Sequence, residues 1–108
     1  MELKKIVAIV RGSVLEAVEE KLRELGADGV SISPVKGYGE YANLYKPDRM
    51  VANIKIEIFT RQSVVDTLVT AIMETAHRGI EGDGFVAVLP VEKLYRIRTK
   101  AEIQPHEW

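Results

Sequence analysis

Three glycines between residues 77 and 84 mark the stretch of this chain whose composition is suited to hold an anion. The stretch reads HRGIEGDG and separates an amphipathic segment from an apolar one. Glycines adopt positive φ angles and let backbone N–H groups approach a ligand closely, as they do in phosphate-binding loops. The alternative interpretation is a helix cap at Gly79 followed by a tight turn, and for this segment alone we favour that alternative.

Two arginines close to the C-terminus change that balance. Arg96 and Arg98 are two positions apart, so on an extended segment both guanidinium groups project to one side and Ile97 to the other. Two adjacent positive charges repel each other, and guanidinium groups match the geometry of phosphate. The alternative is a solvated or salt-bridged pair, which is the more common arrangement. Arg78 would add a third charge within the glycine-rich stretch.

No catalytic or metal-binding pattern accompanies these residues. His77 and His106 have no carboxylates at ligand spacing, so we expect both at the surface. Glu57 is two positions from Lys55, which predicts an ion pair on one face of a strand or, alternatively, an acceptor for the amino group of a base. No nucleophile, base and orienting acid share a recognisable spacing. We therefore expect a protein that is not an enzyme.

Composition excludes several classes of protein. The chain has 108 residues, a length that fits one domain, and its 15 basic and 16 acidic residues give a net charge of -1. That balance does not favour a nucleic-acid partner. The apolar run near the N-terminus is too short for a signal peptide, and no run approaches a membrane span. We expect a cytoplasmic single-domain protein without disulfides or thiolate metal sites, because cysteine is absent.

A few strands and helices must position the candidate residues. The apolar run at residues 6–10 is typical of a central strand covered on both faces. Helical spacing after capping-box sequences at Ser13 and Ser63 predicts two helices, the first of them ending at Gly26. The expected elements are strands at 6–10, 29–35, 54–59 and 85–89, the last halted by Pro90, helices at 14–25 and 63–76, a helical turn at 92–94 and an extended piece at 95–99.

The order of these elements predicts the fold class. Two helical crossovers in this order give the ferredoxin-like βαββαβ (split βαβ) arrangement, an α+β fold with an antiparallel sheet and both helices on one face. The second helix would bury a stripe formed by Val65, Leu68, Val69, Ile72, Met73 and Ala76. Strands with two apolar faces cannot leave one of them in water, so we expect subunit association to cover the face without helices.

A long segment without periodicity, residues 36–51, joins the second and third expected strands. It contains three of the four tyrosines, Tyr38, Tyr41 and Tyr45. A loop of this length in a compact domain is functional or disordered in most cases. Aromatic side chains are depleted in disordered segments and enriched at interfaces. We therefore favour contact with a partner over disorder.

Several separate motifs resemble the PII nitrogen-regulatory signal-transduction proteins. In chain order they are VKGYG at 35–39, KIEI at 55–58, GDG at 82–84, PVEK at 90–93 and RIRT at 96–99. Their order and spacing agree with the family from about residue 4 to residue 99. The resemblance implies a homotrimer of ferredoxin-like subunits with adenine nucleotides in the clefts between neighbours. It also implies a mobile loop, residues 36–51, that docks on a transporter or enzyme according to the nucleotide bound.

The resemblance assigns roles by position. The 77–84 stretch would be the phosphate-binding loop, in which residues 82–84 cradle phosphates, and 96–108 would be the C-terminal loop and tail. Arg96 and Arg98 would reach the phosphates or the ribose. Ser31, Gly37 and Glu57 would line the adenine side. The full set of expected cofactor-binding residues is Ser31, Gly37, Tyr38, Glu57, Gly82, Asp83, Gly84, Phe85, Arg96 and Arg98.

Three departures from the family pattern modify this expectation. Phe85 stands where the family has a lysine directly after Gly-Asp-Gly, and loss of that cation favours ADP or AMP over ATP. The 36–51 loop is several residues shorter than in classical members. Glu40 begins the segment where those members have a basic residue and the glutamine that helps hold 2-oxoglutarate with magnesium. Classical 2-oxoglutarate sensing is therefore not expected. Neither Tyr41 nor Tyr45 is assigned to the tyrosine that some classical members modify.

Two longer motifs indicate a subgroup. GYGEYAN at 37–43 and LPVEKLYR at 89–96 are most similar to short-loop PII-like proteins associated with carboxysome and bicarbonate-uptake genes. That similarity implies a sensor of ADP or AMP together with bicarbonate. One alternative is a short-loop branch that accompanies metal-efflux pumps. Another is a nucleotide-independent trimer of the ferredoxin-like, copper-tolerance kind, which would bind metal or protein and be indifferent to the loss of Arg98.

Overall fold

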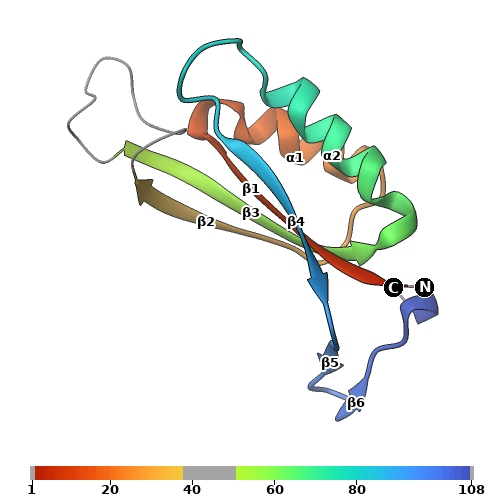
Figure 1. Ribbon diagram of the computed structural model, residues 1–108. Helices are drawn as coiled ribbons and strands as arrows, with labels where there is room; N and C mark the ends of the chain where they lie inside the picture. The colour runs from red at the N-terminus through yellow and green to blue at the C-terminus, as the bar shows by residue number, and fades with distance from the viewer. Residues whose placement is uncertain (1, 38–50, 108) are drawn as a thin grey trace.

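Strand β1, Leu3–Arg11, is a central strand of an antiparallel sheet whose order is β2-β3-β1-β4. The computed structural model describes residues 2–37 and 51–107, and Figure 1 shows both helices on one face of the sheet. The other elements are a 3-10 turn at Gly12–Val14, α1 Leu15–Glu24, β2 Val30–Gly37, β3 Val51–Arg61, α2 Gln62–Ala76, β4 Phe85–Val91, β5 Tyr95–Arg96, β6 Ala101–Glu102 and a 3-10 turn at Pro105–Glu107. The predicted ferredoxin-like βαββαβ fold and the central first strand are confirmed.

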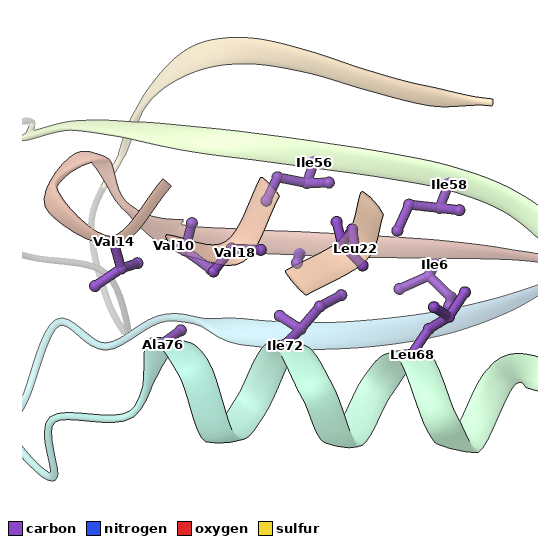
Figure 2. Close-up of a cluster of buried hydrophobic side chains, with 11 residues drawn as sticks. Ile6, Val10, Val14, Val18, Leu22, Ile56, Ile58, Leu68, Ile72 and Ala76 are labelled. Carbon is purple, nitrogen blue, oxygen red and sulfur yellow. The ribbon is translucent and has the colours of Figure 1, made fainter. Parts of the chain in front are cut away.

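The core lies between the sheet and the two helices. Alternate residues of β1 and β3 point to the same side, so Ile6, Ile56 and Ile58 are completely covered. Figure 2 shows these side chains meeting those of both helices. The buried cluster consists of Ile6, Ala8, Val10, Val14, Val18, Leu22, Ile56, Ile58, Leu68, Ile72 and Ala76. Its burial supplies the main favourable term in the stability of the domain.

Helix α1 starts differently from the prediction and ends as predicted. Ser13 lies within the 3-10 turn that precedes the helix, and no side chain in the described part of the chain caps either element. The capping-box prediction is therefore wrong. At the other end, the N–H of Gly26 donates to the carbonyl of Arg23 and the N–H of Ala27 to the carbonyl of Leu22, both at 3.0 Å. With a φ of 74° at Gly26, this pair of hydrogen bonds is a Schellman cap.

Helix α2 follows β3 without a break. It begins at Gln62, and none of the described side chains caps it. The prediction that Ser63 caps this helix is therefore wrong. Most of the predicted stripe is covered, but Met73 is 53% exposed and Ala71 is buried instead. The helix is thus rotated slightly toward its Ala71 flank, and Met73 lines a surface hollow beside β4.

Strand β4 lies at the edge of the sheet and is not the buried strand that its sequence predicts. Phe85, Val88 and Leu89 are between 42% and 46% exposed. The strand also continues through Pro90 to Val91, so the prediction that Pro90 halts it is wrong. Proline is tolerated there because one side of an edge strand has no hydrogen-bonding neighbour.

Strand β2 forms the opposite edge. It contains a second edge proline, Pro34, and its predicted alternation is only partly kept because Ile32 is 40% exposed. Its last residue, Gly37, is buried opposite Val51 of β3. Both edges of the sheet therefore combine a proline with exposed apolar side chains.

The chain beyond β4 forms a small hairpin that projects from the end of the sheet (Figure 1). The helical turn predicted at 92–94 is absent, since residue 92 is a bend and residues 93–94 are irregular. The extended piece predicted to follow it is extended only over β5, because residues 97–100 turn back toward β6. Ile97 in this turn is 93% exposed. Ile103 anchors the hairpin, since its side chain is buried and its N–H donates to the carbonyl of Leu94 at 2.7 Å.

The face of the sheet opposite the helices has no helix over it in the described part of the chain (Figure 1). The register places Val7 beside Ala87 and Lys5 beside Leu89 on this face. Leu89 is 43% exposed, so a single chain leaves apolar surface in water here. Separately, none of the described helices is both long enough and apolar enough to cross a membrane.

Candidate functional site

The glycine-rich turn between α2 and β4 is closed by the carboxylate of Asp83. Its Oδ2 atom accepts hydrogen bonds from the N–H of Arg78 at 3.0 Å and from the N–H of Gly79 at 2.9 Å. These donors lie at the start of the turn, so Asp83 joins its end to its beginning. Backbone N–H groups therefore converge on a negatively charged oxygen, which is the geometry of an anion cradle. In this structure the anion is the protein's own side chain.

Arg11, the last residue of β1, holds the same turn from the side of the sheet. Its Nη2 atom donates to the carbonyl of Glu81 at 2.6 Å, and its Nε atom lies 3.4 Å from Oδ1 of Asp83. The side chains of Arg11 and Asp83 are 25% and 24% exposed, so the ion pair is only partly open to water. Arg78 instead lies along the helix end, where its Nη1 atom donates to the carbonyl of His77 at 3.1 Å.

Gly84 is a position where only glycine fits. Its φ is 96°, and a Cβ atom built there would lie 1.8 Å from the carbonyl oxygen of Ile9 in β1. Gly79 and Gly82 have φ angles of 78° and 93°. The prediction that these three glycines serve positive φ angles is confirmed. The absence of a side chain at Gly84 lets the turn pack directly against the backbone of β1.

Hydrogen bonding favours the charged form of Asp83. The N–H of Arg78 is the largest cause that lowers the pKa of Asp83 below its ordinary value, partial burial acts in the opposite direction, and Gly79 and Arg11 lower the pKa further. The imidazole Nδ1 of His77 lies 3.9 Å from Oδ2 of the same carboxylate, and its side chain is 73% exposed. The surface position predicted for His77 is confirmed. The shorter contacts of the Asp83 carboxylate are with the N–H groups of Arg78 and Gly79 and with Arg11.

A hollow of about 200 Å³ opens beside the turn. It is lined by Val10, Ile72, Met73, Ala76, His77, Asp83, Gly84, Phe85 and Val86. The walls of this hollow are mostly apolar. The glycine-rich turn lies at its rim, because Asp83 and Gly84 are among the lining residues. A larger hollow of about 370 Å³ lies between the N-terminal part of β1, the end of β4 and β6, and no predicted cofactor-binding residue lines it. The candidate site is therefore centred on the smaller hollow and the turn.

Glu57 lies on the uncovered sheet face with a lysine on each side. Its Oε2 atom is 2.5 Å from Nζ of Lys5 and its Oε1 atom is 3.4 Å from Nζ of Lys55. The predicted ion pair between Lys55 and Glu57 is confirmed. The hydrogen bond from Lys5 is the largest cause that holds the pKa of Glu57 below its ordinary value. Ser31 of β2 is directly opposite Glu57, so two predicted site residues are neighbours.

Within one chain the predicted site residues fall into separate groups. Residues 82–84 and Phe85 lie at the start of β4, whereas Arg96 and Arg98 lie beyond its far end (Figure 1). A strand of this length spans roughly 20 Å, so a single chain does not bring the arginines to the turn. Arg96 ends β5 and Arg98 lies in the following turn. The expectation that both project from one extended segment is therefore wrong.

Other predictions fall at the end of β2 and beyond. Gly37 is buried at the point where the loop predicted at 36–51 leaves the sheet. Tyr38, Glu40, Tyr41 and Tyr45 lie outside the described residues. Among residues 2–37 and 51–107, no group of three or more histidine, cysteine, aspartate or glutamate side chains is placed to hold a metal ion.

Arg11 and Lys5 are site residues that sequence reasoning missed. Their partners, Asp83 and Glu57, lie far along the chain, and the contacts depend on how β1 pairs with β3 and β4. The available signal was weak: each is a charged residue in or at the end of an apolar run. A charged side chain in a central strand needs a partner, which would have singled out both.

The family model of nitrogen regulatory protein P-II matches residues 3–101 of this chain. The chain belongs to the P-II family of nitrogen regulatory proteins. It is 38% identical over 104 residues to nitrogen regulatory protein P-II of Azospirillum brasilense, a match that covers 90% of this chain and 93% of that protein. It is 37% identical over 107 residues to nitrogen regulatory protein P-II 1 of Escherichia coli strain K12, covering 93% and 96%.

The P-II fold is also shared with a solved structure. Arabidopsis thaliana PII bound to citrate matches with a TM-score of 0.80 and 35% sequence identity, covering 95% of this chain and 90% of that chain. The resemblance carried by the sequence motifs is confirmed at the level of the family. As a P-II protein, this chain is a signal-transducing regulator and not an enzyme.

Proposed function

We propose that this P-II protein senses adenine nucleotides and regulates a transporter or enzyme through the loop at residues 36–51. The observation that carries the proposal is the glycine turn, whose N–H groups converge on a carboxylate oxygen of Asp83. Phosphate oxygens carry the same sign of charge and accept the same kind of hydrogen bond. In the proposal, residues 82–84 hold the phosphates, and the base lies toward Ser31, Gly37, Tyr38 and Glu57.

The proposed site is completed between subunits of a homotrimer. One chain holds its own Arg96 and Arg98 at the far end of β4 from its glycine turn. A neighbouring subunit supplies the missing guanidinium groups if its hairpin reaches that turn. The uncovered sheet face, where Leu89 is 43% exposed, offers apolar surface for such an association.

The turn favours ligands with few phosphates. Phe85, at the start of β4, is 42% exposed and offers an aromatic face but no charge. Arg11 is engaged by Asp83 and Glu81, and Arg78 lies along the end of α2. Fewer phosphates need fewer cations, so ADP and AMP are the proposed ligands ahead of ATP.

Linkage between the nucleotide and the loop provides the signal. Gly37 lies where the loop leaves β2, so a nucleotide that contacts both Gly37 and the turn favours one loop conformation by its differential affinity. The coupling is reciprocal, so the partner that binds this loop conformation also raises nucleotide affinity. The short loop and the motifs at 37–43 and 89–96 support bicarbonate as a second ligand.

Titration calorimetry with ADP, AMP and ATP, each with and without bicarbonate, tests the proposal. The expected result is tighter binding of ADP and AMP than of ATP, with an affinity that changes when bicarbonate is present. Citrate, to which the Arabidopsis thaliana relative is bound, is a useful competitor because it is a multivalent anion. Absence of heat with all three nucleotides would refute nucleotide sensing.

Arg98→Ala tests the proposed role of the hairpin. Loss of a charge-assisted hydrogen bond is expected to weaken nucleotide binding by about 1.5 to 3 kcal/mol. Arg23→Ala is the matched control, because Arg23 is a 77% exposed arginine of α1 that has no proposed ligand role. An unchanged dissociation constant in Arg98→Ala would argue against the role proposed for Arg98.

A further inference from the structure

We propose that Arg11 is a positioning residue of the glycine turn and sets its affinity for the phosphate end of a ligand. The inference rests on the proposed function. Arg11 is in no predicted site, yet its guanidinium group contacts two different residues of the turn, Glu81 and Asp83. Through these contacts the side chain of Arg11 joins the turn to the end of β1.

The first part of the argument is anchorage. β1 is hydrogen-bonded to β3 on one side and β4 on the other, and Arg11 itself is in register with Asn53, which is 5% exposed. The guanidinium group therefore projects from a residue that is paired with β3, two positions beyond the last pairing of β1 with β4. A turn attached to it is held at two places, through Arg11 and through the close approach of Gly84 to Ile9.

The second part concerns the direction of a peptide group. The C=O and N–H of one planar peptide unit point in opposite directions. Nη2 of Arg11 holds the carbonyl of Glu81 at 2.6 Å, so the N–H of Gly82, in the same peptide unit, is directed away from Arg11. Without this bond the carbonyl is free to rotate, and an oxygen facing the ligand would repel a phosphate. Arg11 thus fixes which end of the dipole the ligand meets.

The third part concerns charge. The carboxylate of Asp83 organises the turn by accepting the N–H groups of Arg78 and Gly79, but it places a negative charge where an anion is to bind. Nε of Arg11, 3.4 Å from Oδ1 of Asp83, offsets that charge. A planar fork is required to reach two acceptors on different residues at once, so lysine is a poor replacement.

Amide exchange in the nucleotide-free protein tests the positioning role by itself. Hydrogen exchange at the N–H groups of Arg78 and Gly79 is measured by NMR in wild type, Arg11→Ala, Arg11→Lys and the control Arg23→Ala. We expect exchange at both amides to be about tenfold faster or more in Arg11→Ala, intermediate in Arg11→Lys and unchanged in Arg23→Ala. Equal rates in all four proteins would overturn the proposal.

Ligand binding then separates positioning of the phosphate end from general damage. Arg11→Ala is expected to weaken ADP and AMP by about tenfold and adenosine by less than about twofold, because adenosine has no phosphate. An equal loss for adenosine and ADP would reject the proposal. If Arg11→Ala does not fold, Arg11→Lys is measured in the same way, and an ADP affinity equal to wild type would reject it.

A double-mutant cycle tests whether Arg11 acts through Asp83. If it does, Arg11→Ala in an Asp83→Ala background is expected to change the ADP dissociation constant by much less than in wild type. Additive losses would contradict action through that carboxylate. A wild-type protein that binds no adenine nucleotide refutes the proposed function, whereas the exchange rates still decide the role of Arg11 in holding the turn.

Discussion

Gly84 is the residue on which the shape of the turn depends most directly. Gly84→Ala places a methyl group 1.8 Å from the carbonyl oxygen of Ile9 at a φ of 96°, so backbone must move. We expect a loss of about 3 kcal/mol in the free energy of unfolding, from the unfavourable φ together with overpacking. Chemical denaturation measures this loss.

Gly26→Ala is the matched control for that substitution. Gly26 also has a positive φ, of 74°, but a Cβ atom there meets nothing within 4 Å. Only the conformational cost of about 1 kcal/mol is expected. Equal losses for the two variants would mean that the turn does not pack against β1 in solution.

The two carboxylates with shifted pKa values predict how stability depends on pH. The pKa of Asp83 is lowered chiefly by the N–H of Arg78, and that of Glu57 chiefly by Lys5. Because the unfolded chain then binds protons more readily, both groups stabilise the fold above their ordinary pKa values of 3.8 and 4.5, and this contribution is lost as pH falls through the lower folded values.

NMR titration of the side-chain carboxyl carbons checks both pKa values, and denaturation over the same acidic range checks the stability. Both groups are partly exposed, so added salt is expected to reduce the effect. Asp83→Asn is expected to make the free energy of unfolding depend less steeply on pH in the acidic range. Titration of Asp83 at or above 3.8 would mean that its bonds to Arg78 and Gly79 do not persist in solution.

Among the elements, the start of α1 gives a sharp test of capping. Ser13 lies in a 3-10 turn and makes no capping hydrogen bond to the described residues. Ser13→Ala is therefore expected to change the free energy of unfolding by less than about 0.5 kcal/mol, where loss of a true N-cap costs about 1 kcal/mol. Thermal or urea denaturation distinguishes the two. A loss of 1 kcal/mol or more would restore the capping box that the sequence predicts.

The sequence predicts an element well when the pattern of apolar and polar residues in that element reflects the contacts that the element makes within the same chain. The alternation in β3 indicated its position and its buried face, the continuous apolar run in β1 indicated its central position, and Gly26 ended α1 as expected. β4 was misjudged because an apolar run has the same appearance whether the neighbouring layer is the same chain or another one. Pro90 lies inside that strand because only an edge strand accepts it.

The candidate site was predictable only in part, for a related reason. The positive φ angles at Gly82 and Gly84 follow from residue type. The contacts of Arg11 with Asp83 and of Lys5 with Glu57 depend on strand register, which local sequence does not specify. The separation of Arg96 and Arg98 from the turn depends on the direction that the chain takes after β4.

For the whole molecule, the uncovered sheet face predicts the assembly. Leu89 is 43% exposed on this face, so Leu89→Asp is expected to shift sedimentation from three chain masses toward the single mass of 12.1 kDa. Leu25→Asp, at a 39% exposed position at the C-terminal end of α1, is the control and should leave the assembly unchanged. A wild-type protein that sediments as one chain would refute the trimer.

The two edge prolines have a consequence for how copies of this chain meet. Pro34 in β2 and Pro90 in β4 each remove a backbone donor from a strand that another molecule could otherwise extend. Edge-to-edge growth into fibrils is thereby disfavoured, whereas the proposed association through the face of the sheet forms a closed oligomer that does not grow further. A concentrated solution should accordingly stay clear and fail to seed polymerisation, and replacing both prolines with valine should make it turbid.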